Sequence, residues 1–88
     1  MARSPEAFND LMKALDAALA GDWERVHPIV QAHEGDPLAN WLHALHHKLE
    51  GEASNARYWY ANSPMDYERF PDPKAELRAI HHALVHED

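Results

Sequence analysis

The chain has 88 residues, of which 45% are hydrophobic, and a net charge of −7 when its histidines are neutral; these values are typical of one small globular domain and exclude a disordered chain. It contains no cysteine, which excludes a disulfide scaffold, a thiolate metal site and a cysteine nucleophile. Its eight lysines and arginines are scattered, so we expect neither a nucleic acid nor an anionic membrane as a partner.

Helix signals predict five helices, at residues 5–20, 23–34, 37–50, 53–62 and 72–87. Polar N-cap residues precede the first, second, third and fifth of these helices, and in three cases a proline follows the cap. These caps are Ser4, Asp22, Asp36 and Asp72. Glycines come just after three apolar runs, where a residue in the left-handed conformation commonly ends a helix. They are Gly21, Gly35 and Gly51.

Apolar residues recur every three or four positions in each predicted helix, as on the buried face of an amphipathic helix. In the third helix this face consists of Leu38, Leu42, Leu45 and Leu49. No stretch alternates as a β-strand does. Residues 63–71 are the one irregular connection, and we expect Met65, Tyr67 and Phe70 to pack it against the helices.

The order of these elements predicts a single domain over residues 1–88. It consists of one hairpin at 5–34, a second at 37–62 and a closing helix at 72–87. The turn at 21–26 has a counterpart thirty residues later, at 51–56. Repeated helical hairpins indicate an α-solenoid, in which stacked neighbours bury the faces that one hairpin leaves open.

The repeat resembles a degenerate tetratricopeptide-like (TPR-like) array over residues 8–63. The resemblance rests on the Gly-acid turn, on small Ala14 and Ala44 where helices cross, and on Ala56 followed four residues later by Tyr60. It implies a concave surface that binds a protein or a peptide. Because arrays of fewer than about three repeats leave an end uncovered, a homo-oligomer is a further expectation.

Polar and aromatic residues on the third and fourth helices are candidates for that binding surface. Their roles would be aromatic contact, imidazole hydrogen bonding and amide recognition of a ligand backbone. The candidates are Asn40, Trp41, His43, His47, Asn55 and Tyr58. For Tyr58, packing against the next helix is an equally simple role.

A metal site is the alternative hypothesis. Residues three and four apart share a helix face, so His43, His46 and Glu50 lie together, and His47 lies one turn beyond His43. Imidazoles suit zinc, nickel or copper. The missing ligand would come from another helix. The preferred candidates are His82 and His86 of the last helix, and His27 and His33 of the second helix are the alternative. If no metal binds, these histidines are packing or surface residues, or they act as a pH switch by titrating. On the preferred hypothesis of a partner-binding module, no cofactor is expected.

Catalysis has no support in the sequence. There is no nucleophile-elbow serine, phosphate loop or dinucleotide fingerprint, so no catalytic residue is predicted and the expected function is non-enzymatic. No window approaches the roughly 20 apolar residues of a membrane span. The first six residues lack the pattern of a signal peptide, and we therefore expect a cytoplasmic protein.

Overall fold

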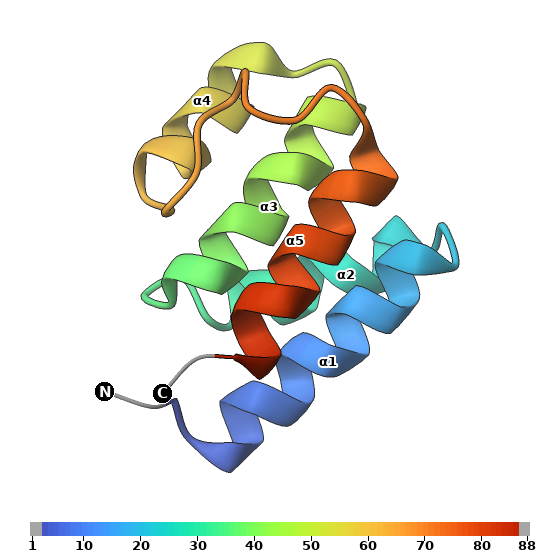
Figure 1. Ribbon diagram of the computed structural model, residues 1–88, viewed down its shortest axis with the longest axis vertical. Helices are drawn as coiled ribbons and strands as arrows, with labels where there is room; N and C mark the ends of the chain where they lie inside the picture. Colours follow the sequence, from blue (N-terminus) through green and yellow to red (C-terminus); the bar gives the residue numbers. More distant parts are fainter. Residues whose placement is uncertain (1–2, 87–88) are drawn as a thin grey trace.

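The computed structural model describes residues 3–86, which form five α-helices joined by short turns and one longer connection (Figure 1). The helices are α1 (Pro5–Leu19), α2 (Trp23–Gln31), α3 (Pro37–Leu49), α4 (Ala53–Ala61) and α5 (Pro73–Val85). The described residues contain no strand, and the predicted all-α fold of five helices is confirmed. The last predicted helical residue, Glu87, lies outside the described residues. None of these helices combines the length and apolar character needed to cross a bilayer.

Each predicted N-cap forms the expected hydrogen bond to the first turn of its helix. The Ser4 Oγ accepts from the backbone N–H of Ala7 at 3.1 Å. The carboxylates of Asp22, Asp36 and Asp72 likewise cap α2, α3 and α5. These bonds satisfy N–H groups that have no partner within the helix.

Two of the three glycine predictions are confirmed. Gly21 has a φ of 80° and Gly51 a φ of 77°, both in the left-handed region after a helix. The prediction for Gly35 is wrong, because its φ is not positive. Helix α2 ends earlier, at Gln31, and its next residue, Ala32, stays right-handed with φ −71°. The chain then turns through hydrogen bonds such as that from the N–H of His33 to the carbonyl of Val30.

Helix α3 lies at the centre of the packing. It contacts α2, α4 and α5, while α1 contacts α2 and α5. Helices α1, α2, α3 and α5 therefore form a closed ring, in which α5 lies between α3 and α1 (Figure 1), and α4 packs on α3. With partners on several sides, α3 buries most of its residues. They are Leu38, Ala39, Asn40, Trp41, Leu42, His43, Ala44, Leu45 and His46.

The connection between α4 and α5 lies against the helices as predicted. Met65, Tyr67 and Phe70 are partly buried against the core. The Lys48 Nζ donates to the carbonyl oxygens of Tyr67 and Phe70, both at 2.8 Å. A side chain of α3 thus anchors a segment that has no regular secondary structure.

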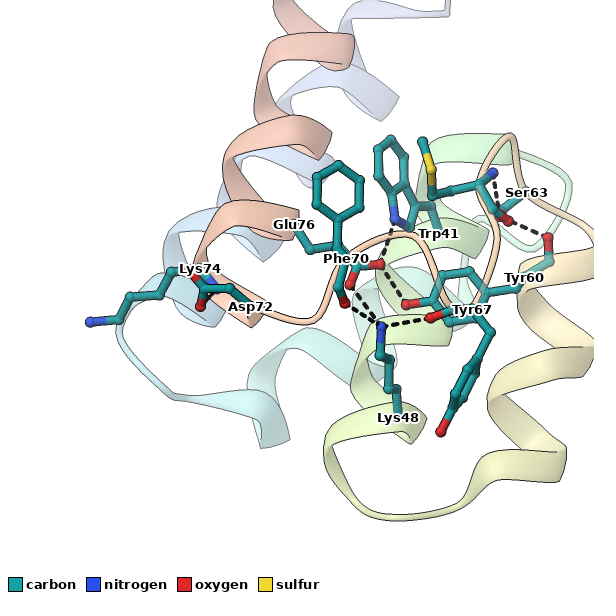
Figure 2. Close-up of polar contacts among 10 residues, drawn as sticks. Trp41, Lys48, Tyr60, Ser63, Tyr67, Phe70, Asp72, Lys74 and Glu76 are labelled. Carbon is teal, nitrogen blue, oxygen red and sulfur yellow. Dashed lines mark hydrogen bonds and ion pairs between the residues drawn. The ribbon is translucent and has the colours of Figure 1, made fainter.

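A buried carboxylate of α5 joins this helix to α3 and α4, and Lys48 links it to the connection (Figure 2). Glu76 of α5 is fully buried. Its Oε2 accepts from the Trp41 Nε1 at 2.9 Å and from the Tyr60 hydroxyl, and its Oε1 lies 3.3 Å from the Lys48 Nζ. Burial, and then the hydrogen bond to Glu76, raises the pKa of Tyr60 above its usual range. The carboxylate is therefore both paired and hydrogen-bonded, as a buried charge requires.

Substitution of Glu76 tests how much this network contributes to the stability of the fold. Glu76→Ala leaves the Lys48 ammonium without its buried partner, and we expect the free energy of unfolding to fall by about 3–5 kcal/mol. The measurement is urea denaturation followed by circular dichroism. Glu68→Gln is the control, because Glu68 forms an exposed ion pair with Arg57, and its midpoint should stay unchanged. Equal midpoints for the two variants would contradict the role assigned to Glu76.

Candidate functional site

Four histidines meet on the side of α3 that faces α2, and together they form what we call the histidine cluster. Three come from α3 (His43, His46 and His47), and His27 comes from α2. The ring centroid of His27 lies 5.0 Å from that of His43, 4.9 Å from that of His46 and 5.7 Å from that of His47. The cluster arises because α3 places its histidines at spacings of three and four, and α2 crosses above them.

Two groups of side chains within and beside this cluster have metal-ligand geometry. His27, His43 and His47 each offer a nitrogen, and these three atoms lie within 4.8 Å of one another. His46, His47 and Glu50 form a second such group with the same limit. Both groups include His47, and only the first draws its ligands from two helices.

The deepest histidine is His43. It is 2% exposed, and its ring stacks on that of Trp59 from α4 with centroids 4.0 Å apart. The Nδ1 atoms of His43 and His46 are buried without a hydrogen-bond partner. Such atoms are rare in folded proteins because an unmade hydrogen bond costs about 1–3 kcal/mol.

The surroundings favour the neutral form of the two buried rings of the cluster, His43 and His46. Burial lowers the pKa of His43 from 6.5 to about 4, and the neighbouring imidazoles of His47, His27 and His46 add to this effect. Burial also lowers the pKa of His46, although Glu50 opposes it. Neutral imidazole is the form that donates an electron pair to a metal ion.

Acidic side chains hold two of the rings in orientation. The Nδ1 of His47 lies 2.7 Å from the Glu52 Oε1, and the Nε2 of His46 lies 3.4 Å from the Glu50 Oε1. The hydrogen bond from His47 lowers the pKa of Glu52. Since an ionised carboxylate only accepts, the Nδ1 of His47 is the donor in this contact, and in a neutral ring the lone pair is then on Nε2. The left-handed turn at Gly51 brings Glu52 back towards α3.

The cluster borders a hollow of about 520 Å³. His27 and His47 are among its lining residues, together with Trp23 and the exposed side chains of Glu24, Glu50 and Glu52. His43 is not among them and is more deeply buried than His27 and His47, which are half-buried. An ion or small molecule can therefore reach the cluster from this side.

The six predicted partner-binding residues are not on one exposed surface. Asn40, Trp41 and His43 are buried, and the Asn40 Nδ2 donates to the carbonyl of Asn62 at 3.0 Å. Asn55 is exposed, and Tyr58 is 62% exposed on α4. Trp41 is instead a donor to Glu76, which sequence reasoning did not identify. No periodic signal marks Glu76, because one charged residue on a helix is usually solvated.

The histidines of α5 lie apart from the cluster. His82 and His86 stack on each other with centroids 4.2 Å apart, and they line a separate hollow with Asp16 of α1. Neither belongs to a ligand group among the described residues. His33, the other candidate on the α2 side, pairs with Asp10 at 3.0 Å. Of the alternatives left open by the sequence, the structure brings His27 to the histidines of α3.

Comparisons with family models, with curated proteins and with solved structures find no match for this chain. The chemistry of the histidine cluster is therefore the basis for assigning a function.

Acidification tests the buried state of His43. Its pKa is about 4 in the folded protein and 6.5 in the unfolded chain, so below pH 6.5 the unfolded chain takes up the proton more readily. We expect the free energy of unfolding of metal-free protein to fall from pH 6.5 to pH 4, by on the order of 3 kcal/mol from this one group. The measurement is urea denaturation at a series of pH values. His43→Gln should reduce the dependence of the unfolding free energy on pH, whereas His82→Gln, at an exposed position, should not. If this free energy falls equally with pH in both variants, His43 is not held in its neutral form.

Proposed function

We propose that this protein binds one divalent first-row transition metal ion through the imidazoles of His27, His43 and His47. The observation that carries the proposal is the approach of three imidazole nitrogens to within 4.8 Å of one another from two helices. Imidazole ligands suit zinc, nickel and copper. The chain has no cysteine, so thiolate ligands play no part.

The three ligand atoms lie within 4.8 Å of one another, so a bound ion would require them to move closer together. Nitrogens at about 2.0–2.1 Å from a tetrahedral zinc ion lie about 3.3 Å from one another. Small side-chain rotations of His27 and His47 cover the difference, because both rings are only partly buried. His43, stacked on Trp59, supplies the fixed ligand towards which the other two move.

The carboxylate behind His47 supports the same proposal. Metal-bound histidines usually donate their second ring N–H to a carboxylate, a carbonyl or water, which fixes the tautomer and raises the basicity of the ligand nitrogen. Glu52 has this relation to His47, at 2.7 Å. This contact would leave Nε2 as the ligand atom of His47 and limit the ring to small rotations.

The second group, His46, His47 and Glu50, is a weaker candidate. All three residues belong to α3 or its C-cap, and Glu50 is exposed. A site on one helix gains less from preorganisation by the fold than a site that joins two helices. Because both groups use His47, variants of His27 and Glu50 distinguish them.

Partner binding, including self-association, is a second candidate function. The observation that favours it is the 62% exposure of Tyr58, whose ring packs edge-on against Trp59 with centroids 5.0 Å apart. A large exposed aromatic ring on a rigid helix is typical of an interface anchor.

Removal of the α2 ligand tests the metal proposal. We expect untagged protein to bind one zinc ion, measured by competition with a chromophoric chelator. His27→Gln removes a ligand and should weaken that affinity at least tenfold. Loss of a residue that only hydrogen-bonds to a metal ligand already weakens metal binding tenfold to hundredfold. Zinc at 100 times its dissociation constant should also raise the free energy of unfolding by about 2.7 kcal/mol.

Two matched variants complete this experiment. Glu50→Gln and His82→Gln should both keep the zinc affinity of the wild type, since neither residue belongs to the three-imidazole group. A large loss in Glu50→Gln with none in His27→Gln would assign the site to the second group. Absence of stoichiometric binding in the wild type would refute the proposal.

Self-association has its own test in sedimentation velocity over a range of protein concentrations. We expect a concentration-dependent dimer in the wild type that Tyr58→Ser shifts towards monomer. Ser54→Ala, at another exposed position of α4, is the matched control. A monomer at every concentration would exclude self-association through α4.

A further inference from the structure

The three-imidazole group is one ligand short of the coordination that these metals take. Zinc in proteins is almost always four-coordinate in structural sites, and catalytic sites hold three protein ligands and one exchangeable ligand. Among residues 3–86, no fourth side chain joins His27, His43 and His47 within the 4.8 Å limit. The fourth ligand therefore has to come from a nearby acid, from His46 or from outside the protein.

The nearby side chains already have partners. Glu52 accepts from the Nδ1 of His47 at 2.7 Å. Glu50 lies 3.4 Å from the Nε2 of His46, and the ring of His46 stacks on that of His27. Recruitment of any of them to the metal would break the contact that orients a ring of the cluster.

The hollow in front of the cluster provides room for an external ligand. Its volume is about 520 Å³, and two of the three imidazole ligands, His27 and His47, line it. The third, His43, closes the site from beneath against Trp59. The side of the metal turned away from His43 therefore faces the hollow.

The charge of the hollow restricts the kind of ligand. Glu24, Glu50 and Glu52 line it, while its lining includes no lysine or arginine. Three carboxylates near a coordination position disfavour an anion and tolerate a neutral nitrogen or oxygen donor. Trp23 adds an aromatic wall, which suits a ligand with a flat or apolar part.

From this arrangement we infer that the metal keeps one exchangeable coordination position, open to the hollow, that takes a small neutral donor such as an imidazole or an amine in preference to an anion. The inference rests on the proposed metal site and adds a ligand class to it. Glu24 acts as a specificity-determining residue through its charge alone, because it belongs to neither ligand group.

Cobalt(II) substitution is the experiment. Metal-free protein is loaded with cobalt, and the visible ligand-field bands, which depend on the ligands and geometry of the ion, are recorded during titration with imidazole and, separately, with azide. We expect saturable spectral changes with imidazole and binding of azide that is at least tenfold weaker. Equilibrium dialysis at the end of each titration verifies that cobalt has stayed on the protein.

Two variants assign the effects to residues. Glu24→Gln should tighten azide binding about twofold to fivefold, as expected for removal of one nearby charge, and leave imidazole binding unchanged. Glu68→Gln, which removes an exposed charge paired with Arg57 elsewhere, should change neither. Glu50→Gln should leave the bands of the ligand-free cobalt protein as they are.

The outcomes separate this inference from the function on which it rests. Cobalt bands that depend on His27 but do not respond to imidazole overturn the exchangeable position and keep the metal site. Azide binding as tight as that of imidazole overturns the ligand class. Altered bands in Glu50→Gln identify Glu50 as the fourth ligand. Failure to bind cobalt at a site that requires His27 overturns the proposed function, and the inference with it.

Discussion

The buried carboxylate of Glu76 is the constraint that sets the orientation of the central helix. It draws Trp41 and Lys48 of α3 towards α5, and these two residues are seven apart, so they lie on nearly the same line along the helix. His43, His46 and His47 then lie roughly 120–160° around α3 from Trp41. The network thus turns one side of α3 towards α5, and the histidines lie on the other side, where His27 of α2 meets them.

The local features of the fold are readable from the sequence because short-range physics determines them. A serine or aspartate before a helix has few alternatives to capping it, as at Ser4 and Asp36. Gly21 and Gly51 mark turns that need a left-handed residue. At Gly35 the same reasoning fails, because α2 had already ended in right-handed turns that need no glycine.

The contacts between distant helices could not be predicted from the sequence in this way. That His43, His46 and His47 share part of a helix surface follows from their spacing. Which other helix supplies a partner depends on crossing angles and on the closure of α5 onto α1, which no local pattern encodes. The sequence therefore favoured His82 and His86 as the completing ligands, whereas the structure places His27 beside the histidines of α3. Glu76 gave no signal, since only its packing environment distinguishes it from a solvated acid.

The contacts that complete the core join distant parts of the chain. Glu76 meets Trp41 across 35 residues and Tyr60 across 16. Translation proceeds from the N-terminus, so α3 and α4 are synthesised before Glu76, the acceptor for Trp41 and Tyr60. Folding of the ring then waits for α5. Until this helix is synthesised, the apolar side chains that it covers in the folded protein stay exposed and accessible to chaperones. A chain whose translation stops before Glu76 therefore lacks the residue that closes the core.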